Sequence, residues 1–424
     1  MKYIGREMRI RKTRKVRKII GRGDLQIMED IVIAAAVRTP IGSLGGSLKN
    51  ILPETILSIV FKAAIIKSGI NAAMIDEVIA GQTKQTTDAP NIARVASLIS
   101  GVPESVPAYT VHRQCASGMQ AMTNAMQQIQ CGYSDIVLAG GVESMSTAPF
   151  YIRNARFGVG SGNGLFLDPN VESQPKSQPS DIYGIFNMIQ TADNVAKQFD
   201  ISREAQDEFA FESQRKAAVA IDGGKFNEEI VPVILPQKKK EPIIFAVDEY
   251  PKRDTNLEKL AKLKPIFSDG TVTAGNASGR NDGACALVMM SASKAKAMGM
   301  KPLAKIIGVA AAGVDPRIMG IGPIAAVEKL LPKLKMSIND FGLYEINEAF
   351  AAQSIACARV LKMDPEKLNV NGGAIALGHP LGCSGARIST TLIHEMRRRN
   401  EQYGLASICV AGGLGMAMAF ELVD

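Results

Sequence analysis

The sequence predicts a layered α/β fold, and two observations point to this class. Apolar runs at 31–37, 78–81 and 135–141 have the length of buried strands, and segments with helical periodicity, such as 53–68, lie between them. Strands that alternate with helices favour a sheet that is covered by helices. At 424 residues the chain is long for one hydrophobic core, so we expect two or three domains.

The first half begins with the strand at 31–37, which runs into a turn at 38–42 that contains Pro and Gly. Residues 53–68 place apolar and polar side chains at helical spacing, and the short apolar run 78–81 then predicts a second strand. This alternation is the pattern expected of a sheet built from successive strand and helix units.

A cysteine stands between the next two elements. Residues 107–111 form a short extended segment, and 116–130 are good helix formers whose larger apolar side chains share one stripe. Cys115 is therefore predicted to lie at a helix N-terminus, where free N–H groups and the helix dipole stabilise a thiolate. A free cysteine chosen at random is more often a small buried hydrophobe, so its role depends on what the fold brings near it.

The middle of the chain changes character. Residues 151–185 are rich in Gly, Asn, Ser and Pro and show little periodicity, which indicates an excursion from the core. Two amphipathic helices are predicted after it, at 188–199 and 202–221, and Ser202 is a suitable N-cap for the second. Residues 145–273 are therefore predicted to form a separate loop domain.

A possible internal repeat links the two ends of the chain. Ser117-Gly118 opens a helix and is followed by Ala139-Gly140-Gly141, and the same pattern recurs as Ser384-Gly385 followed by Ala411-Gly412-Gly413. Each half is interpreted as a helix packed on a strand that ends in Ala-Gly-Gly. Two similar halves stacked face to face would bring Cys115 close to the glycine turns of the second half.

The net charge of +8 belongs to one end of the chain. Residues 1–27 carry ten Lys or Arg against two acidic residues, and the other 397 residues carry 39 charges of each sign. This segment could be a targeting peptide or a polyanion-binding arm, but we favour a non-functional upstream extension, because the residues from Met28 onward have the pattern of a natural domain start. The neutral body gives no reason to expect nucleic-acid binding.

Six widely spaced cysteines (115, 131, 285, 357, 383 and 409) form no Cys-x-x-Cys pair, and there is no secretory signal. This pattern favours reduced thiols in the cytoplasm and argues against a disulfide framework or a metal site. No apolar run approaches the ~18 residues that a membrane span needs, so we expect none.

The three histidines differ in their surroundings. His394 lies within a helical segment beside charged residues, and we predict a surface position. His112 fits a pocket residue and a structural residue equally well. His379 lies in 371–385, a loop with five glycines before a helix, where the backbone can approach a ligand closely, so we expect it to be functional.

Five motifs occur in a fixed order: 38–42 (RTPIG), 113–118 (RQCASG), 275–283 (GNASGRNDG), 347–350 (NEAF) and 378–382 (GHPLG), with 409–413 (CVAGG) near the end. Jointly they resemble the thiolase family of acetyl-CoA acyltransferases, from Asp30 to Asp424. The resemblance implies reversible Claisen condensation of two acetyl-CoA to acetoacetyl-CoA, or thiolysis of 3-ketoacyl-CoA by coenzyme A, with ping-pong chemistry.

The implied fold has two duplicated βαβαβαββ halves in five layers, with an inserted loop domain that helps to bind coenzyme A. The chain would then consist of a basic extension (1–27) that we predict to be disordered, an N-terminal half (28–144, completed by residues near 274–300), the loop domain (145–273) and a C-terminal half (301–424).

The resemblance also implies catalytic roles. Cys115 would take the acyl group as nucleophile, His379 would be its base, and Cys409 would move the α-proton of the substrate. Asn347 would hold a water that forms one oxyanion hole with His379, and the backbone N–H groups of Cys115 and Ala411 would form the other. Claisen chemistry needs these groups: an acyl thioester, a base for a carbon acid, and donors for two oxyanions.

Binding roles follow in the same way. Ser278 and the neighbouring Ala277 would contact coenzyme A, and Met319 and Phe350 would line the acyl pocket. Coenzyme A would be substrate and product, with no tightly bound cofactor and no metal. Small acyl-CoA molecules are then the expected ligands, and by analogy the enzyme is a homodimer or a homotetramer.

Two positions depart from the family pattern. Thiolases often have Asn where this chain has His112, and the third place of a common Cys-x-Gly motif holds Ala411. A backbone N–H donates equally well from Ala, so the second oxyanion hole survives unless the position needs a positive φ.

Four other functions remain open, and the first, a polyanion-binding protein, is disfavoured by the neutral body of the chain. A β-ketoacyl synthase-like condensing enzyme shares the fold but uses one Cys with two His, or with His and Asn. A papain-like hydrolase would need no loop domain for coenzyme A. A non-catalytic acyl-CoA binder would not require the combination of Cys115, His379 and Cys409.

Overall fold

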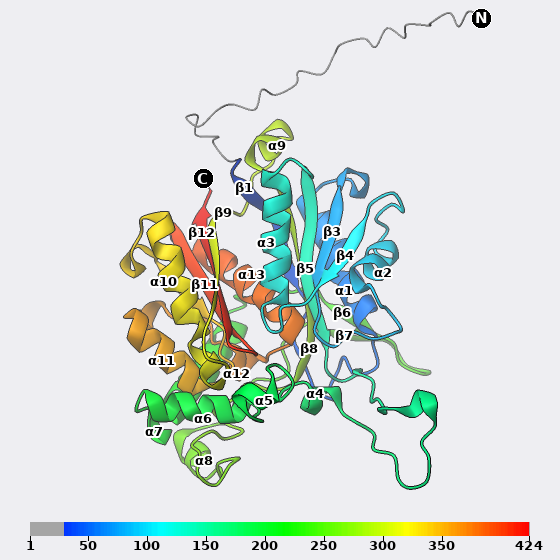
Figure 1. The fold of residues 1–424 in the computed structure, drawn as a ribbon. Coiled ribbons are helices and arrows are strands. Elements are labelled where there is room, and N and C mark those ends of the chain that lie inside the picture. Colours follow the sequence, from blue (N-terminus) through cyan, green and yellow to red (C-terminus); the bar gives the residue numbers. More distant parts are fainter. Residues whose placement is uncertain (1–28, 424) are drawn as a thin grey trace, which may run out of the picture.

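The computed structural model describes residues 29–423, and these form two α/β halves that face each other across a central pair of helices (Figure 1). The basic extension predicted at 1–27 lies outside the described residues. Within 29–423, no helix combines the length and the apolar character that crossing a membrane requires.

The first half contains a five-stranded sheet made of β1 (Ile31–Arg38), β8 (Asn281–Ser291), β5 (Ile136–Ser144), β3 (Glu77–Gly81) and β4 (Ala108–Val111), in that order. β3 pairs parallel with β4 and β5, whereas β8 pairs antiparallel with β1 and β5. The short β2 (Gly42–Ser43) pairs with β8.

The second half contains a four-stranded sheet in the order β10 (Leu343–Ile346), β11 (Tyr403–Val410), β12 (Leu414–Leu422) and β9 (Ala304–Gly313). β10 pairs parallel with β11, and β12 pairs antiparallel with β11 and β9. The first three residues of β1 pair with β9, so the two sheets are connected at one end.

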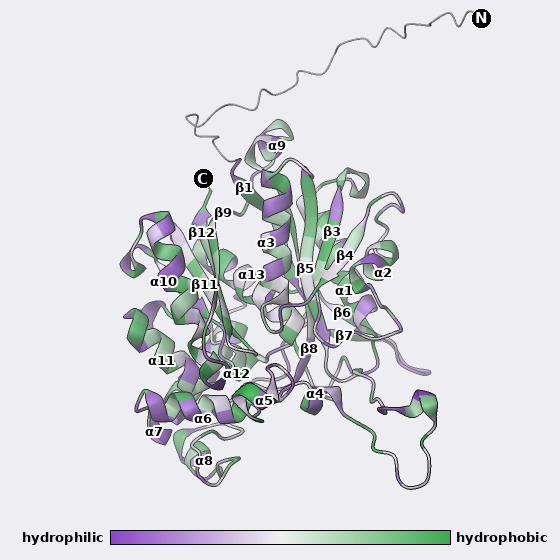
Figure 2. Cartoon of the chain, viewed as in Figure 1, coloured by the Kyte–Doolittle hydropathy of each residue, from purple (hydrophilic) through white to green (hydrophobic). Residues whose placement is uncertain are grey.

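Helices complete five layers (Figure 1). The outer layer of the first half holds α1 (Pro53–Ser68) and α2 (Ile92–Ile99), the central layer holds α3 (Ser117–Gln130) and α13 (Leu381–Arg399), and the outer layer of the second half holds α10 (Gly322–Leu334) and α11 (Ala351–Leu361). The predicted five-layer fold is therefore confirmed. One hydrophobic core lies on both sides of the central helices, and a separate core fills each of the two outer interfaces. The apolar residues gather on the strands (Figure 2).

Outside the excursion, the remaining helices are short. They are α9 (Ala292–Ala297) and α12 (Ala374–Leu377), with 3₁₀ turns at Ala72–Met74, Ala155–Phe157, Pro316–Ile321, Ile338–Asp340 and Pro365–Lys367.

The excursion leaves the core after β5 and returns at β8. It contains α4 (Pro169–Glu172), α5 (Ser180–Tyr183), α6 (Met188–Gln198), α7 (Arg203–Asp222), β6 (Val233–Leu235), β7 (Ile243–Phe245) and α8 (Leu257–Ala261). Ser202 caps α7, as its sequence indicated, by accepting the N–H of Ala205. The exact domain boundaries remain a prediction.

The central helices touch through small residues. A Cβ added to Gly118 of α3 would lie 2.9 Å from the carbonyl oxygen of Gly382, at the start of α13. Because glycine has no Cβ, the first turns of α3 and α13 can pack backbone to backbone. Cys115 and His379 each precede one of these helices by two residues, so the contact brings them to the same end of the central layer.

The predicted repeat needs one correction. Ala411-Gly412-Gly413 follows β11 as a turn, but Ala139-Gly140-Gly141 lies inside β5, which continues to Ser144. The glycines of β5 serve close packing instead, because a Cβ on Gly141 would collide with the carbonyl oxygen of Gly382.

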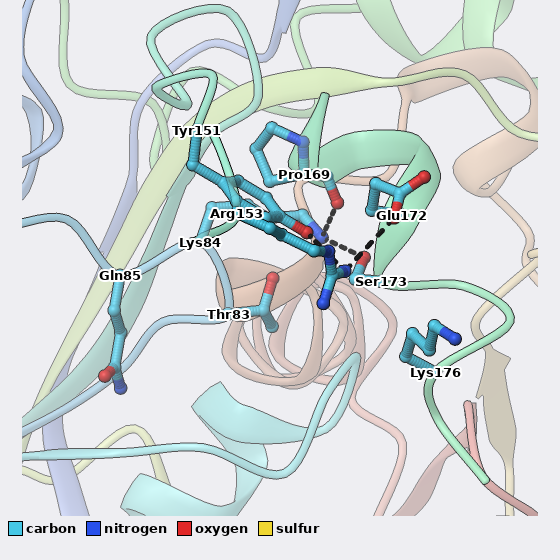
Figure 3. Close-up of a pocket in the computed structure, with 9 residues that line it drawn as sticks. All are labelled: Thr83, Lys84, Gln85, Tyr151, Arg153, Pro169, Glu172, Ser173 and Lys176. Carbon is cyan, nitrogen blue, oxygen red and sulfur yellow. Dashed lines mark hydrogen bonds and ion pairs between the residues drawn. The ribbon is translucent and has the colours of Figure 1, made fainter. Parts of the chain in front are cut away.

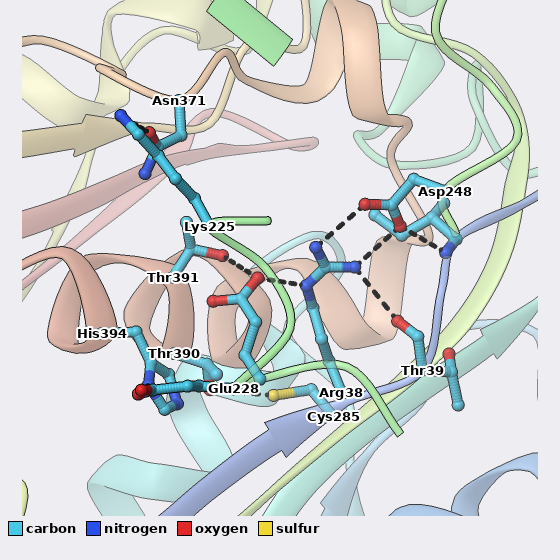
Figure 4. A network of polar contacts seen from close by, with 12 residues as sticks. Arg38, Thr39, Lys225, Glu228, Asp248, Cys285, Asn371, Thr390, Thr391 and His394 are labelled. Atoms are coloured by element: carbon cyan, nitrogen blue, oxygen red, sulfur yellow. Dashed lines mark hydrogen bonds and ion pairs between the residues drawn. The ribbon is translucent and has the colours of Figure 1, made fainter. Parts of the chain in front are cut away.

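A buried ion network ties the excursion to β1 (Figure 4). The fully buried Arg38 donates from Nε to Glu229 (2.5 Å) and from both terminal nitrogens to Asp248 (2.7 and 2.9 Å). Breaking one partner of such a pair leaves a buried charge uncompensated, which typically costs ~3–5 kcal/mol. The network therefore holds the excursion against the core.

The predicted surface position of His394 is wrong. The residue is 3% exposed, and its Nε2 lies 3.0 Å from the carbonyl oxygen of Ala36. Its helix, α13, forms part of the central layer and is covered from every side, so even a helix segment rich in polar residues is buried there.

Candidate active site

Cys115 lies in a tight turn between β4 and α3. Ser117 shapes this turn, because its hydroxyl donates to the carbonyl oxygen of Gln114 (2.6 Å) and accepts the N–H of Arg113 (2.8 Å). Gln114 takes a left-handed conformation with φ of 45°. α3 begins at Ser117 with Ala116 as its N-cap, so Cys115 stands just outside the helix and remains partly exposed.

Burial opposes the thiolate stabilisation that the sequence predicts for Cys115. Burial raises the pKa of this thiol to about 11, and the backbone N–H groups of Ala411 and of Cys115 itself lower it by less. Cys115 is therefore a neutral thiol that needs a base.

Cys409 is the last residue but one of β11 and is fully buried. Its side chain packs in a small apolar cluster with Met319, Phe350 and Ala277, three residues that the sequence assigned to the acyl and coenzyme A pockets. Burial raises the pKa of this thiol well above its ordinary value, and the neighbouring Cys115 adds to the effect. The two thiols thus lie within electrostatic reach of each other.

His379 is held by contacts on three sides. Its backbone N–H donates to Asn281 (2.9 Å), its Nδ1 lies 2.6 Å from the hydroxyl oxygen of Ser384, and its Nε2 lies 3.4 Å from the amide nitrogen of Asn347. The preceding Gly378 has φ of 105°, a conformation that side chains rarely adopt. The residue is only 4% exposed, so these partners fix the orientation of its ring.

The hydrogen bonds of Ser384 assign the tautomer of His379. The Ser384 hydroxyl has one proton, which it donates to the carbonyl oxygen of Pro380 (2.9 Å). It must therefore accept the N–H of His379 Nδ1, and Nε2 carries a free lone pair. Burial, and then the positive charge of Arg387, lower the pKa of His379 to about 3. The imidazole is neutral and able to accept a proton at Nε2.

Asn347 follows β10 and is fully buried. Its backbone N–H donates to the carbonyl oxygen of Ser407 on β11, which fixes the turn. Its Oδ1 accepts no hydrogen bond from the residues that the structure describes. A buried oxygen of this kind is where an ordered water finds a partner.

Ala411 does not need the conformation reserved for glycine. Gly412 and Gly413 have φ of 89° and 80°, but Ala411 is not among the residues with positive φ. An Ala at this position is therefore unstrained, and its N–H still reaches the sulfur of Cys115.

Ser278 and Ala277 are joined to the NEAF segment by a strand-like contact. Ala277 bridges Phe350, and the N–H of Ser278 donates to the carbonyl oxygen of Ala349 (3.0 Å). Ser278 itself is partly exposed. The contact carries the loop that contains Ser278 to the edge of the cluster around Cys409.

His112 is exposed and lies beside the turn, so the structure gives it no pocket of its own. Three residues near the site were not predicted from the sequence: Ser384, Glu143 and Lys84. Glu143 is fully buried and accepts N–H groups from Thr83, Lys84 and Gly382, which locks the loop after His379 onto β5. A serine five residues after His379, at the start of a helix, was the one available signal for Ser384.

In the part of the chain that the structure describes, no three His, Cys, Asp or Glu side chains gather in a way that could hold a metal ion. The chemistry that this arrangement can perform rests on two thiols, one neutral imidazole and several fixed donors.

Comparisons with known proteins agree with this arrangement. The family described as "Thiolase, N-terminal domain" matches residues 31–293, and "Thiolase, C-terminal domain" matches 300–422. An acetyl-CoA acetyltransferase of Cupriavidus necator is 47% identical over 395 residues, which are 93% of this chain and 100% of that protein.

Two solved structures share the fold. The acetyl-CoA acetyltransferase of Bacillus anthracis has a TM-score of 0.91 and 48% identity, with 93% of this chain and 99% of that chain covered. Human mitochondrial 3-ketoacyl-CoA thiolase in complex with CoA has a TM-score of 0.88 and 42% identity, with 93% and 98% covered.

Proposed function

The chain belongs to the thiolase family, and from this premise we propose how its two thiols divide the work of acyl transfer. The protein is an acyl-CoA acyltransferase. The reactions are condensation of two acetyl-CoA into acetoacetyl-CoA and the reverse thiolysis of 3-ketoacyl-CoA by coenzyme A, and both pass through an acyl group on Cys115.

One observation supports this proposal above the others. The backbone N–H of Ala411 is close enough to Cys115 to lower the pKa of its thiol, and Ala411 follows a second buried thiol, Cys409, by two residues. A condensing enzyme with a single Cys and two His would need another imidazole, but His394 bonds to β1 and His112 is exposed. Two thiols with one imidazole suit thiolase chemistry.

In the acylation step, Cys115 Sγ attacks the carbonyl carbon of an acyl-CoA while His379 Nε2 takes its proton. The N–H groups of Cys115 and Ala411 stabilise the oxyanion. When the bond from carbon to the CoA sulfur breaks, the leaving thiolate takes the proton of Cys409. The raised pKa of Cys409 supports this role, because the group is protonated before the reaction.

In the condensation step, the Cys409 thiolate takes the α-proton of a second acetyl-CoA. The resulting carbanion attacks the acyl carbon on Cys115, the bond to Cys115 Sγ breaks, and that sulfur recovers its proton from His379. A water held by Asn347 and His379 stabilises the enolate oxygen. Protons therefore balance over the cycle, and thiolysis is the same sequence reversed.

Coenzyme A enters as substrate and leaves as product, and no bound cofactor is required. Ser278 and Ala277 would contact its pantetheine arm, and Met319 and Phe350 would line the acyl pocket. The apolar cluster that joins Ala277, Met319 and Phe350 to Cys409 supports this assignment. The solved human relative in complex with CoA supports coenzyme A as the ligand.

We further propose a cytoplasmic homodimer or homotetramer. All six cysteines are free thiols, which suits a reducing compartment. The excursion carries large exposed apolar side chains, among them Phe157 and Phe166, which a second copy could cover. Light scattering after size exclusion tests the oligomeric state.

The function is tested by thiolysis of short and long 3-ketoacyl-CoA substrates, with the product acyl-CoA measured. We expect CoA-dependent cleavage that shows ping-pong kinetics. Binding of these substrates without cleavage would instead favour a non-catalytic acyl-CoA binder.

A further inference from the structure

A charged cavity opens between the segment after β3 and the excursion (Figure 3). Its volume is about 470 Å³. Three cations, Lys84, Arg153 and Lys176, line it together with one carboxylate, Glu172. Arg153 and Glu172 form an ion pair at 3.2 Å, so the side chains that line the cavity keep a surplus of positive charge, and two carboxylates outside the lining, Glu143 and Asp168, act on Lys84.

Lys84 forms the buried wall of this cavity. The residue is 8% exposed, and its Nζ donates to the carbonyl oxygen of Pro169 (3.0 Å) and to the hydroxyl of Ser173 (2.5 Å). An ammonium group has three N–H donors, and these two bonds use two of them. Burial lowers the pKa of Lys84, and the nearby Glu143 opposes this shift. A buried cation in such a place gains from an anionic partner.

The cavity borders the candidate active site. Ser177, next to the cavity residue Lys176, lies 3.5 Å from the side chain of Gln114, the residue before Cys115. A Cβ on Gly412, the residue after Ala411, would lie 2.7 Å from the carbonyl oxygen of Ser177. The same wall therefore touches both loops that carry the catalytic thiols.

Lys84 confirms this proximity from the other side. Burial dominates the pKa of both Lys84 and Cys115, but each group also acts on the other: the cation lowers the pKa of the thiol. Charge interactions weaken with distance, so this mutual effect agrees with the contacts that Ser177 makes to Gln114 and to the Gly412 turn. An acyl group bound to Cys115 therefore starts beside the cavity.

We propose that this cavity receives the far end of the acyl chain and selects substrates whose chain ends in a carboxylate, that is, 3-ketoacyl-CoA thioesters of dicarboxylic acids. This inference rests on the proposed function and adds a substrate class to it. A terminal carboxylate would accept the third N–H of Lys84 and face Arg153 and Lys176.

A terminal methyl group fits this cavity poorly. It would displace water from three cations without giving them a hydrogen-bond acceptor, and unpaired polar groups of this kind cost binding energy. A site with polar groups that bind a charged substrate strongly rejects an analogue that lacks the charge. An apolar site rejects an analogue with an added polar group less strongly. The preference should therefore appear as a ratio of kcat/KM values.

The test compares thiolysis of 3-oxohexanedioyl-CoA with that of 3-oxohexanoyl-CoA, which has the same number of carbons but ends in a methyl group. For the unmodified enzyme we expect kcat/KM to be at least about tenfold higher for the carboxylate substrate. Arg153→Gln and Lys176→Gln should each lower the ratio of the two kcat/KM values several-fold to about tenfold. A tenfold change corresponds to roughly 1.4 kcal/mol. Glu172→Gln should raise it.

Lys62→Gln is the matched control, because Lys62 is an exposed lysine on α1, away from the cavity. It should leave the ratio unchanged. Arg153 and Lys176 are also exposed, so their replacement should not impair folding.

A phosphate of coenzyme A is the other anion that the cavity could hold. In that case the Arg153 and Lys176 variants would raise KM for both substrates in parallel and leave their ratio constant, which would overturn the proposal. Equal kcat/KM values in the unmodified enzyme would also overturn it. If the enzyme cleaves acetoacetyl-CoA but shows no preference for the carboxylate substrate, only the proposed substrate class is wrong. If it does not cleave acetoacetyl-CoA either, the proposed function itself is wrong.

Discussion

The Nδ1 atom of His379 lies 2.6 Å from the hydroxyl oxygen of Ser384, and that hydroxyl donates to the carbonyl oxygen of Pro380. Because the Ser384 hydroxyl donates its proton to Pro380, it accepts the hydrogen bond from His379. The proton of the imidazole is therefore held at Nδ1. Nε2 then faces Asn347 with a lone pair. One buried serine thus sets the tautomer that the proposed role of His379 as a base requires.

Replacing this serine should slow catalysis without unfolding the protein. In Ser384→Ala the imidazole can rotate or change tautomer, so we expect kcat to fall roughly 10- to 100-fold with little change in KM. Ser389→Ala is the matched control, because the Ser389 hydroxyl makes the same kind of bond on the same helix, to the carbonyl oxygen of Gly385 (2.9 Å). Equal losses in both variants would show a structural effect only.

Ala411 offers a test of the oxyanion donor. Ala411→Pro removes the N–H that reaches Cys115, and loss of one such donor typically costs ~10²- to 10³-fold in kcat. Ala411→Gly keeps the N–H and should retain activity. Steady-state kinetics with thermal unfolding as a check on folding distinguishes the two; a fully active Pro variant would remove this N–H from the mechanism.

Ser278 is predicted to act on binding. If its hydroxyl contacts the pantetheine arm, Ser278→Ala removes an interaction made equally in the ground state and the transition state. KM for coenzyme A thioesters should then rise about five- to tenfold, with a smaller effect on kcat. A kcat loss as large as that of a Cys115 variant, at unchanged KM, would contradict the assignment.

Glu345 predicts how stability depends on pH. Burial, opposed by the charge of Arg387, raises the pKa of this carboxyl to about 8, so the native state keeps a proton that the unfolded state loses near its ordinary value of 4.5. The contribution of this carboxyl to the free energy of unfolding should therefore be largest below that value and fall as the pH rises toward 8. At pH 8 to 9, the free energy of unfolding of Glu345→Gln, measured by denaturant unfolding, should exceed that of the unmodified protein by a few kcal/mol. The difference should shrink toward pH 5. A constant difference across this range would refute the shift.

Local signals in the sequence predicted the elements well. The predicted helix 53–68 has these same bounds in the structure, because Pro53 suits the first turn and Gly69 ends the helix with φ of 73°. The capping role of Ser202 was visible for the same reason. In both cases neighbours along the chain determine the outcome.

Burial by distant elements could not be predicted in this way. His394 is flanked by charged residues, but α13 lies between two sheets, and Glu395 is paired with Arg398 and Arg399 from within the helix. The pKa of Cys115 is governed by the second half packing over the turn. Both effects depend on elements that are distant in the sequence, so the residues next to His394 and Cys115 along the chain do not reveal them.

The candidate site was found through motifs, which carry residue types but no geometry. The motifs supplied Cys115, His379, Cys409 and Asn347, whose roles are still predictions. Lys84 had no such signal, because its partners are a carbonyl oxygen and a hydroxyl on α4, more than 80 residues away. A buried cation beside a thiol becomes visible only when the chain is folded.

Cys115 is proposed to carry the acyl group and Cys409 to move protons, and mass spectrometry after exposure to acetyl-CoA distinguishes the two thiols. The Cys409→Ala protein should carry an acetyl group on Cys115 yet fail in thiolysis and condensation, whereas the Cys115→Ala protein should carry none. An acetyl group on Cys409 in the Cys115→Ala protein, or no adduct on Cys115 in the Cys409→Ala protein, would contradict this division of roles.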